Sequence, residues 1–129
     1  MDLILEVEGL HVDLPLPAGR LQAVRNVGFE LRQGETLSLV GESGCGKSLT
    51  ALALMGLLPP RASCRASKLF FEGCNLSTAS EKTMAQLRGD RMAMIFQEPM
   101  TSLNPCYTIG NQLVEAYRQH REASRREAR

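Results

Sequence analysis

Apolar and polar residues alternate at the start of the chain. The alternation runs from Ile4 to Leu14 and again from Ala23 to Leu31. A period of two is typical of strands that bury one face. The stretch between them, Pro15–Gly19, reads PLPAG and predicts a loop. Because a short loop joins two alternating segments, we expect antiparallel β structure here.

Continuous apolar runs follow. Thr36–Val40 comes after a turn signal at Gln33-Gly34, and Met92–Phe96 lies in the second half of the chain. Runs of this length, without alternation, are consistent with strands that are buried on both faces. Lys68–Phe71 predicts a further short strand. The chain therefore combines an alternating opening with buried-strand candidates further on.

Two helices are predicted between these runs. Lys47–Leu58 is apolar on most sides, which predicts a buried helix that Pro59 stops. Thr78 and Glu81 have capping-box spacing. This spacing predicts a helix of about eight residues that ends near Arg88.

A third helix is predicted from about Ile109 onward. Three of its apolar side chains fall on one face: Leu113, Ala116 and Tyr117. The last residues are rich in arginine, with Glu122 and Glu127 between the arginines. A basic run can indicate nucleic acid, but i,i+4 pairs such as Glu122–Arg126 favour a solvated helix face.

Composition narrows the function classes. The 129 residues fit one domain, and the net charge of +1 gives no global field that would favour nucleic acid. Only 5% of residues are aromatic and none is Trp, so little surface is available for base stacking. No apolar run approaches the roughly 20 residues that span a bilayer. The acidic N-terminus does not resemble a signal peptide, so we expect a cytoplasmic protein.

The four cysteines form no CxxC pair. They are Cys45, Cys64, Cys74 and Cys106. This spacing disfavours a zinc or iron–sulfur site, and we expect reduced thiols. Cys45 lies before a predicted helix, where its thiol could be more reactive. A small side chain at a free position is the simpler interpretation.

The stretch Gly41–Ser48 reads GESGCGKS and matches GxxxxGK[ST] in full. Gly44 and Gly46 lack a Cβ, so the backbone is free to take a positive φ and approach phosphate oxygens. Loop N–H groups and the next helix N-terminus then form an anion site. In this pattern Lys47 contacts the β- and γ-phosphates, and the Ser48 hydroxyl ligates Mg²⁺. The residues expected to hold the nucleotide are Gly41, Glu42, Ser43, Gly44, Cys45, Gly46, Lys47, Ser48 and Leu49.

Hydrolysis by such a protein also needs an acid after a second buried strand. The candidate strand, Met92–Phe96, ends in Gln97 and Glu98, and Pro99 follows at once. Glu98 is the one acid near this end, and a small kinase that uses Glu98 for its metal is the weakest of the alternatives. Gln97 is the first polar residue after this run, at the position where a side chain would reach the nucleotide site.

The segment MAMIFQEPMTSLNPCYTIGNQLVEA, with GESGCGKS upstream, resembles the ATP-binding subunits of ABC importers. It is most similar to those that serve oligopeptides, dipeptides and nickel. The resemblance implies an α/β, P-loop NTPase (ABC ATPase) fold that is incomplete. An antiparallel β subdomain would span residues 1–35, the first part of the parallel-sheet P-loop core residues 36–99, and the start of a helical subdomain residues 100–129.

The resemblance also implies roles, cofactors and partners. Gln97 is similar to the Q-loop glutamine, which ligates Mg²⁺ and contacts the attacking water; ATP and Mg²⁺ are the implied cofactors. The loop from Glu98 to Thr108 resembles the segment that contacts a membrane permease. A second ATPase subunit and, indirectly, a periplasmic solute-binding protein are further implied partners. The implied location is cytoplasmic, on the inner face of the cell membrane.

Two departures from the family qualify these expectations. An aromatic residue usually stacks on adenine where this chain has Leu14. The signature LSGGQ, the acidic strand with its catalytic glutamate and the switch histidine do not occur in the 129 residues. We therefore expect a truncated ATPase subunit of a peptide importer that binds nucleotide but does not hydrolyse it alone. The alternative is a small nucleotide-binding module without ATPase activity.

Overall fold

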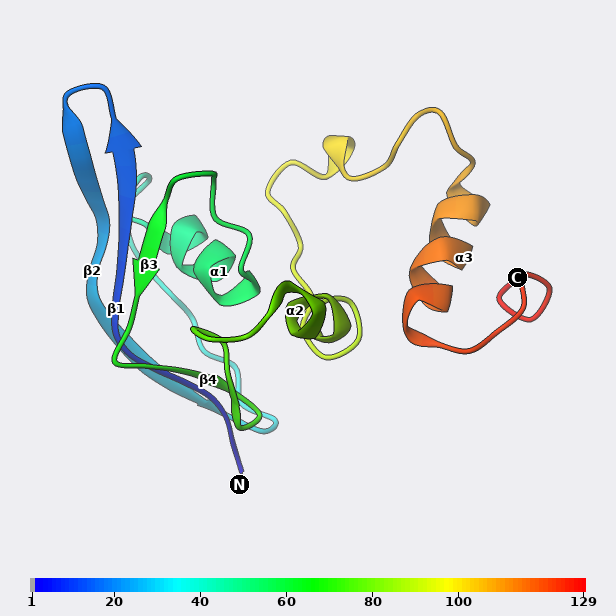
Figure 1. The fold of residues 1–129 in the computed structure, drawn as a ribbon, viewed down its shortest axis with the longest axis horizontal. Coiled ribbons are helices and arrows are strands. Elements are labelled where there is room, and N and C mark those ends of the chain that lie inside the picture. The colour runs from blue at the N-terminus through cyan, green and yellow to red at the C-terminus, as the bar shows by residue number, and fades with distance from the viewer. Residues whose placement is uncertain (1) are drawn as a thin grey trace. The chain divides into compact units, whose positions relative to one another are not determined.

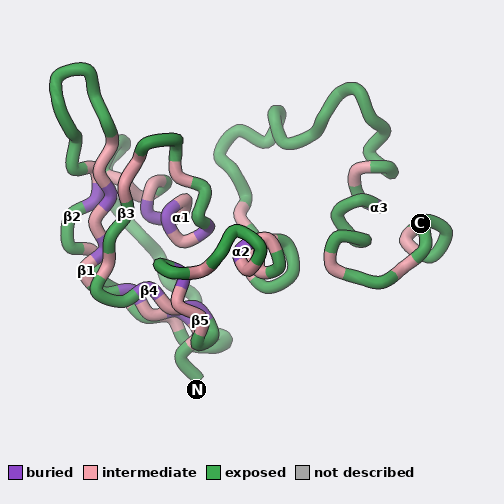
Figure 2. Tube along the Cα trace, in the orientation of Figure 1, coloured by how far each residue is buried: buried purple, intermediate pink, exposed green. Residues whose placement is uncertain are grey.

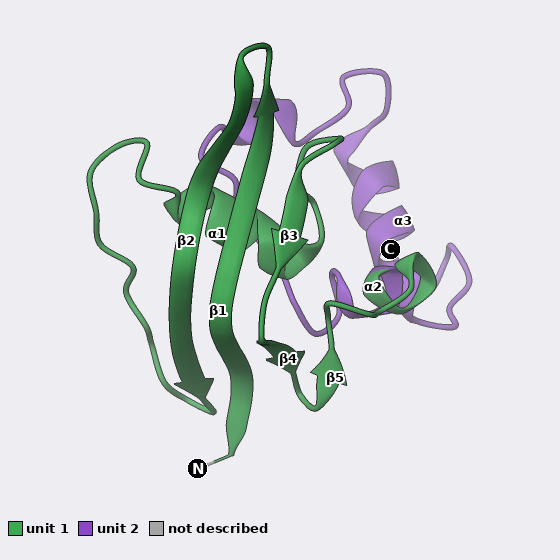
Figure 3. Ribbon diagram, turned by 60° about the vertical axis from the view of Figure 1, so that its left-hand side comes forward, with its two compact units in different colours: residues 1–84 green, residues 85–129 purple. Residues whose placement is uncertain are grey.

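The computed structural model describes residues 2–129, and Met1 lies outside the described residues. The chain forms two compact units, residues 1–84 and residues 85–129 (Figure 3). The resemblance implies three segments, residues 1–35, 36–99 and 100–129. The compact units do not test these boundaries, so this subdivision stays a prediction.

A long hairpin dominates the first unit. Strand β1 (Leu3–Leu16) pairs antiparallel with β2 (Gly19–Arg32). The turn between them falls within the predicted loop, so the expected antiparallel opening is confirmed. The register shifts near Gly9, which has a φ of 61°. Its missing Cβ would lie 2.9 Å from the Ser67 hydroxyl, so glycine fits this bend both in conformation and in space.

Three short strands extend the sheet. They are β3 (Ser63–Arg65), β4 (Lys68–Phe71) and β5 (Cys74–Asn75). The strand order is β2-β1-β4-β5. Strand β3 pairs with another part of β1, as Figure 1 shows. Only β4 is predicted from the sequence, because two or three residues are too few to show a period. Hydrogen bonds to Glu6 and Glu8 raise the pKa of Lys68 and tie β4 to β1.

Helix α1 (Lys47–Met55) packs on this sheet. Its Thr50, Ala53 and Met55 are buried, whereas its other side chains are half-buried or exposed. Buried residues gather on β1, β4 and α1 (Figure 2). The helix is shorter than predicted because Gly56 takes a left-handed conformation, with a φ of 64°, and closes the C-terminus. The buried apolar residues of this unit are Leu5, Val7, Leu10, Val12, Val24, Ala53, Met55, Leu69, Phe71, Leu76 and Met84.

The two buried-strand predictions are wrong. Thr36–Val40 and Met92–Phe96 lie outside the helices and strands, and Met92 makes an isolated bridge to Arg88. Val40 is 93% exposed and Ile95 is 96% exposed. A strand buried on both faces needs hydrogen-bonded neighbours, and no named strand in residues 2–129 pairs with either run. Their apolar composition is therefore not matched by burial.

Helix α2 (Glu81–Leu87) begins where predicted, but its cap differs. The Ser80 hydroxyl accepts a hydrogen bond from the Thr83 N–H at 3.2 Å, so Ser80 is the capping residue. The capping box at Thr78 is therefore wrong. Ser80 directly precedes the helix, so its side chain stands at the N-cap position, where it accepts from an N–H of the first turn.

The second unit contains a 3₁₀ turn (η1, Pro99–Thr101) and α3 (Ile109–His120). The Thr108 hydroxyl caps α3 by accepting from the Asn111 N–H. The helix buries Val114, while the predicted apolar face around Leu113 is exposed.

The arginine-rich tail is not helical, so the predicted Glu122–Arg126 helix pair is wrong. Arg121 is extended, with φ −133° and ψ 135°, and ends α3. Its guanidinium pairs with Asp90 at 2.8 Å. Because the backbone leaves the helical conformation at Arg121, the later arginines do not continue along the helix face. The Ser124 N–H donates instead to the Glu127 carboxylate in a local turn.

Candidate functional site

The glycine turn has the conformation that the phosphate motif predicts. Gly44 has a φ of 81° and Gly46 a φ of 91°, both in the left-handed region. A Cβ on Gly46 would lie 2.7 Å from the Ala23 carbonyl oxygen of β2. Glycine at position 46 is therefore required by conformation and by space together. At position 41 glycine is favoured by space and not by backbone conformation, because a Cβ there would overlap with the Cys45 Sγ.

The start of α1 is open to an anion. Gly46 is the N-cap, no side chain caps the helix, and its first turn holds no acidic residue. The first N–H groups of a helix have no partner within it, and the helix dipole adds positive potential there. Thr50 stays bound to the turn, because its Oγ1 donates to the Gly46 carbonyl at 2.9 Å. Together these groups form a site of positive potential.

The Lys47 ammonium bends back over the turn. Its Nζ donates to the carbonyl oxygens of Gly41 at 2.6 Å and Glu42 at 2.8 Å, and lies 3.4 Å from the Cys45 Sγ. The charge is thus held at the turn by neutral acceptors. A phosphate oxygen carries full negative charge and offers Lys47 a stronger partner than these carbonyls do.

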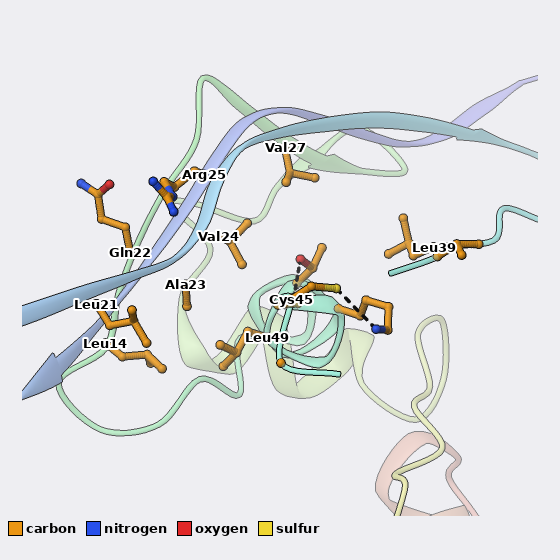
Figure 4. A pocket seen from close by; sticks show the side chains of 15 residues that line it. Leu14, Leu21, Gln22, Ala23, Val24, Arg25, Val27, Leu39, Cys45 and Leu49 are labelled. Atoms are coloured by element: carbon orange, nitrogen blue, oxygen red, sulfur yellow. Dashed lines mark hydrogen bonds between the residues drawn. The ribbon is translucent and has the colours of Figure 1, made fainter. Parts of the chain in front are cut away.

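A pocket of about 570 Å³ joins the turn to the hairpin (Figure 4). This size suits a nucleotide or another small organic ligand. Its walls come from the glycine turn, α1, the hairpin and the exposed run before the turn. The lining residues are Leu14, Leu21, Gln22, Ala23, Val24, Arg25, Val27, Leu39, Val40, Gly44, Cys45, Gly46, Lys47, Leu49 and Thr50.

The pocket brings together part of the predicted nucleotide set. Gly44, Cys45, Gly46, Lys47 and Leu49 all line it. Gly41 and Glu42 contact Lys47 instead. Ser43 and Ser48 are exposed. Sequence reasoning missed Thr50 and Leu21. Alternation along β2 indicates which face Leu21 is on, but the depth of the pocket there depends on the fold.

Gln97 belongs to the second unit, where it is exposed in a bend next to Glu98. The loop after it is braced by Gln112 of α3. The Gln112 side chain accepts from the Asn104 N–H at 2.8 Å and donates to the Asn104 and Tyr107 carbonyls. This bracing was not predicted, because the spacing of an amide and its loop carries no sequence signal.

The residues around the turn fit Mg²⁺ held jointly with phosphates. No group of three or more His, Cys, Asp or Glu able to hold a metal occurs among residues 2–129. Mg²⁺ commonly keeps several waters and binds through substrate phosphates and few protein groups. The Ser48 hydroxyl, exposed in the first turn of α1, is such a group. All four cysteines are free.

The chain matches the sequence profile of the ABC transporter family over residues 24–129. It is 47% identical to a dipeptide transport ATP-binding protein of Bacillus subtilis, over 100% of this chain. It is 44% identical to an oligopeptide transport ATP-binding protein of the same organism, over 98% of this chain. It is 48% identical to a glutathione import ATP-binding protein of Escherichia coli, over 97% of this chain.

The matched region is a fraction of each relative. It covers 39% of the dipeptide protein, 36% of the oligopeptide protein and 21% of the glutathione protein. Within residues 2–129, no helix is both long and apolar enough to cross a membrane.

Proposed function

This chain belongs to the ABC transporter family, and from that premise we propose that it is the ATP-binding part of an importer for peptides or related small solutes. The family carries an α/β P-loop NTPase fold and ATPase activity in general. The observation that carries the proposal is the open glycine turn at the start of α1, with Lys47 held over it. The names of the matched relatives support peptides as the solute class.

The proposed ligand is ATP with Mg²⁺. The loop N–H groups and the α1 N-terminus would surround the phosphates. Lys47 would exchange its carbonyl partners for phosphate oxygens, and Ser48 would hold the metal with them. Mg²⁺ would supply charge neutralisation of the phosphates. Gln97 would contact the metal and the attacking water when the site closes.

The proposed partners are a membrane permease, a second ATPase subunit and, indirectly, a periplasmic solute-binding protein. The permease would contact the loop from Glu98 to Thr108, which Gln112 holds in shape. A braced loop transmits a displacement better than a loose one, because it moves as a unit. The proposed location is the cytoplasmic face of the membrane.

We further propose that residues 1–129 bind nucleotide without turning it over. Two observations support this. The run Met92–Phe96 is not held in a sheet, and the residue that follows it directly is Gln97 rather than an acid that would hold the metal. A steady-state phosphate-release assay with MgATP is expected to show no release above the Lys47→Ala variant.

Turnover that requires Mg²⁺ and is lost in Lys47→Ala would contradict the proposal that this chain is inactive alone. A matched control is the same assay on a variant with an exposed lysine outside the site, Lys82→Ala on α2. Saturable ATP binding without turnover fits both the importer subunit and a non-hydrolysing module. Recruitment of the chain to vesicles that contain a peptide permease would favour the importer.

A further inference from the structure

The second unit contains a contact between residues that are far apart in the sequence. The Arg121 guanidinium, at the end of α3, pairs with the Asp90 carboxylate at 2.8 Å. The neighbouring His120 ring lies against Gly89, because a Cβ on Gly89 would lie 2.9 Å from the His120 Nε2. We call Gly89, Asp90, His120 and Arg121 the closing contact, since it brings together the two ends of residues 91–120.

This unit has little apolar core to hold it in shape. Val114 is the only buried apolar residue in residues 85–129. A region with few buried apolar contacts opens at a low cost in free energy. Exposed ion pairs contribute little to a well-packed domain, but here the polar contacts have less apolar packing beside them. The Asp90 side chain is only 27% exposed, so its pair with Arg121 is partly shielded from solvent.

Helix α3 connects the closing contact to the loop that carries Gln97. Near the start of α3, the Gln112 side chain accepts from the Asn104 N–H at 2.8 Å and donates to the Asn104 carbonyl at 2.9 Å. It also donates to the Tyr107 carbonyl at 3.1 Å. The closing contact holds the other end of the same helix. Because a helix of 12 residues is a stiff rod about 18 Å long, fixing its far end also orients the end that holds the loop.

We propose that Asp90 and Arg121 are positioning residues for the loop from Gln97 to Thr108. They act through α3 and Gln112. The part that this loop plays as a permease contact rests on the proposed function. Its attachment to Asp90 and Arg121 is a property of this chain alone, so the two are tested separately.

The test measures hydrogen exchange of the Asn104 and Tyr107 amides, which donate to Gln112 and to the Asn104 carbonyl. Asp90→Asn removes the ion pair and leaves every residue of α3 unaltered. It is expected to speed exchange at both amides about fivefold, and Arg121→Gln should do the same. The double variant should exchange no faster than either single variant, because both remove one contact. Arg121→Lys retains the charge and should stay within about twofold of the unaltered chain.

Arg126→Gln is the matched control. Arg126 is exposed on the same tail and takes no part in the closing contact, so exchange at Asn104 and Tyr107 should not change. Faster exchange confined to the last turn of α3 would overturn the proposal, because Arg121 would then stabilise only the helix end. Additive effects of Asp90→Asn and Arg121→Gln would overturn it as well, since the two side chains would then act independently.

Recruitment to vesicles that contain a peptide permease gives a second readout. Asp90→Asn is expected to weaken recruitment about fivefold, because the loop is then held in its bound shape for less of the time. Affinity for MgATP should change little, since the glycine turn belongs to the other unit. Equal recruitment of the variant and the unaltered chain would contradict the positioning role. Failure of both to be recruited, with exchange as expected, would contradict the proposed function alone.

Discussion

Replacing Lys47 by alanine is expected to weaken MgATP binding about 10- to 100-fold. Hydrogen bonds to charged groups contribute about 1.5–3 kcal/mol each, which corresponds to this range of affinity. Among residues 2–129, the hydrogen-bond partners of the Lys47 Nζ are two carbonyl oxygens and one sulfur. It is free to exchange these neutral partners for phosphate oxygens. Titration with a fluorescent ATP analogue measures the loss.

The control for Lys47→Ala is Lys82→Ala, which removes one positive charge from the exposed face of α2. It tests whether net charge alone explains the change in affinity. Long-range attraction between exposed charges is screened within about 10 Å at 0.1 M salt, so Lys82→Ala should change affinity little. Equal losses in the two variants would mean that ATP binds by general charge attraction rather than at the turn.

Replacing Gly46 by alanine is expected to damage both binding and stability. An alanine at a φ of 91° is strained, and its Cβ would lie 2.7 Å from the Ala23 carbonyl oxygen. The strain and the overlap together should lower the free energy of unfolding by about 2–4 kcal/mol. The turn must also move away from β2, which displaces the N–H groups that face the anion. Nucleotide affinity should fall at least tenfold, as measured by the same titration.

Gly34→Ala separates strain from overlap. Gly34 has a φ of 77°, yet nothing lies within 4 Å of the position of its missing Cβ. This variant is expected to lose about 1 kcal/mol of stability, from backbone strain alone, and to keep its nucleotide affinity. Urea unfolding gives both stabilities. A Gly46→Ala variant that is no less stable than Gly34→Ala would show that the contact with Ala23 does not constrain the turn.

The hairpin could be predicted from the sequence because its evidence is local. Alternation over Ile4–Leu14 and Ala23–Leu31 records which face is buried, and the loop between them is short. The short strand predicted at Lys68–Phe71 matches β4. The short strands β3 and β5 depend on pairing with β1 and β4, and such pairing leaves no pattern in two or three residues.

The strand predictions for Thr36–Val40 and Met92–Phe96 are wrong because their evidence is not local. Their composition favours burial, but burial on both faces is a property of the surrounding sheet and not of the run itself. With no strand beside them in residues 2–129, Val40 and Ile95 lie exposed. The predicted capping positions differ from the observed ones by a few residues. Ser80 caps α2 and Gly56 ends α1 through local backbone geometry, which sequence spacing describes only approximately.

Part of the candidate site could likewise be predicted from the sequence, and part depends on the fold. The motif predicted positive φ at Gly44 and Gly46 and the helix start at Lys47, because these follow from the chemistry of a phosphate turn. It could not predict that Ala23 approaches the turn or that Leu21 lines the same pocket, since both depend on how β2 packs against the turn. The role of Gln97 stays a prediction.

Isothermal titration of the chain with ATP, ADP and AMP, each with Mg²⁺, tests the central claim most directly. If the glycine turn and Lys47 recognise the phosphates, one site should bind ATP more tightly than ADP, and AMP at least about tenfold more weakly than ATP. Each lost phosphate removes charge-assisted hydrogen bonds from Lys47 and the turn. Equal affinity for ATP and AMP, or no saturable heat with ATP, would contradict the assignment of this turn as the phosphate site.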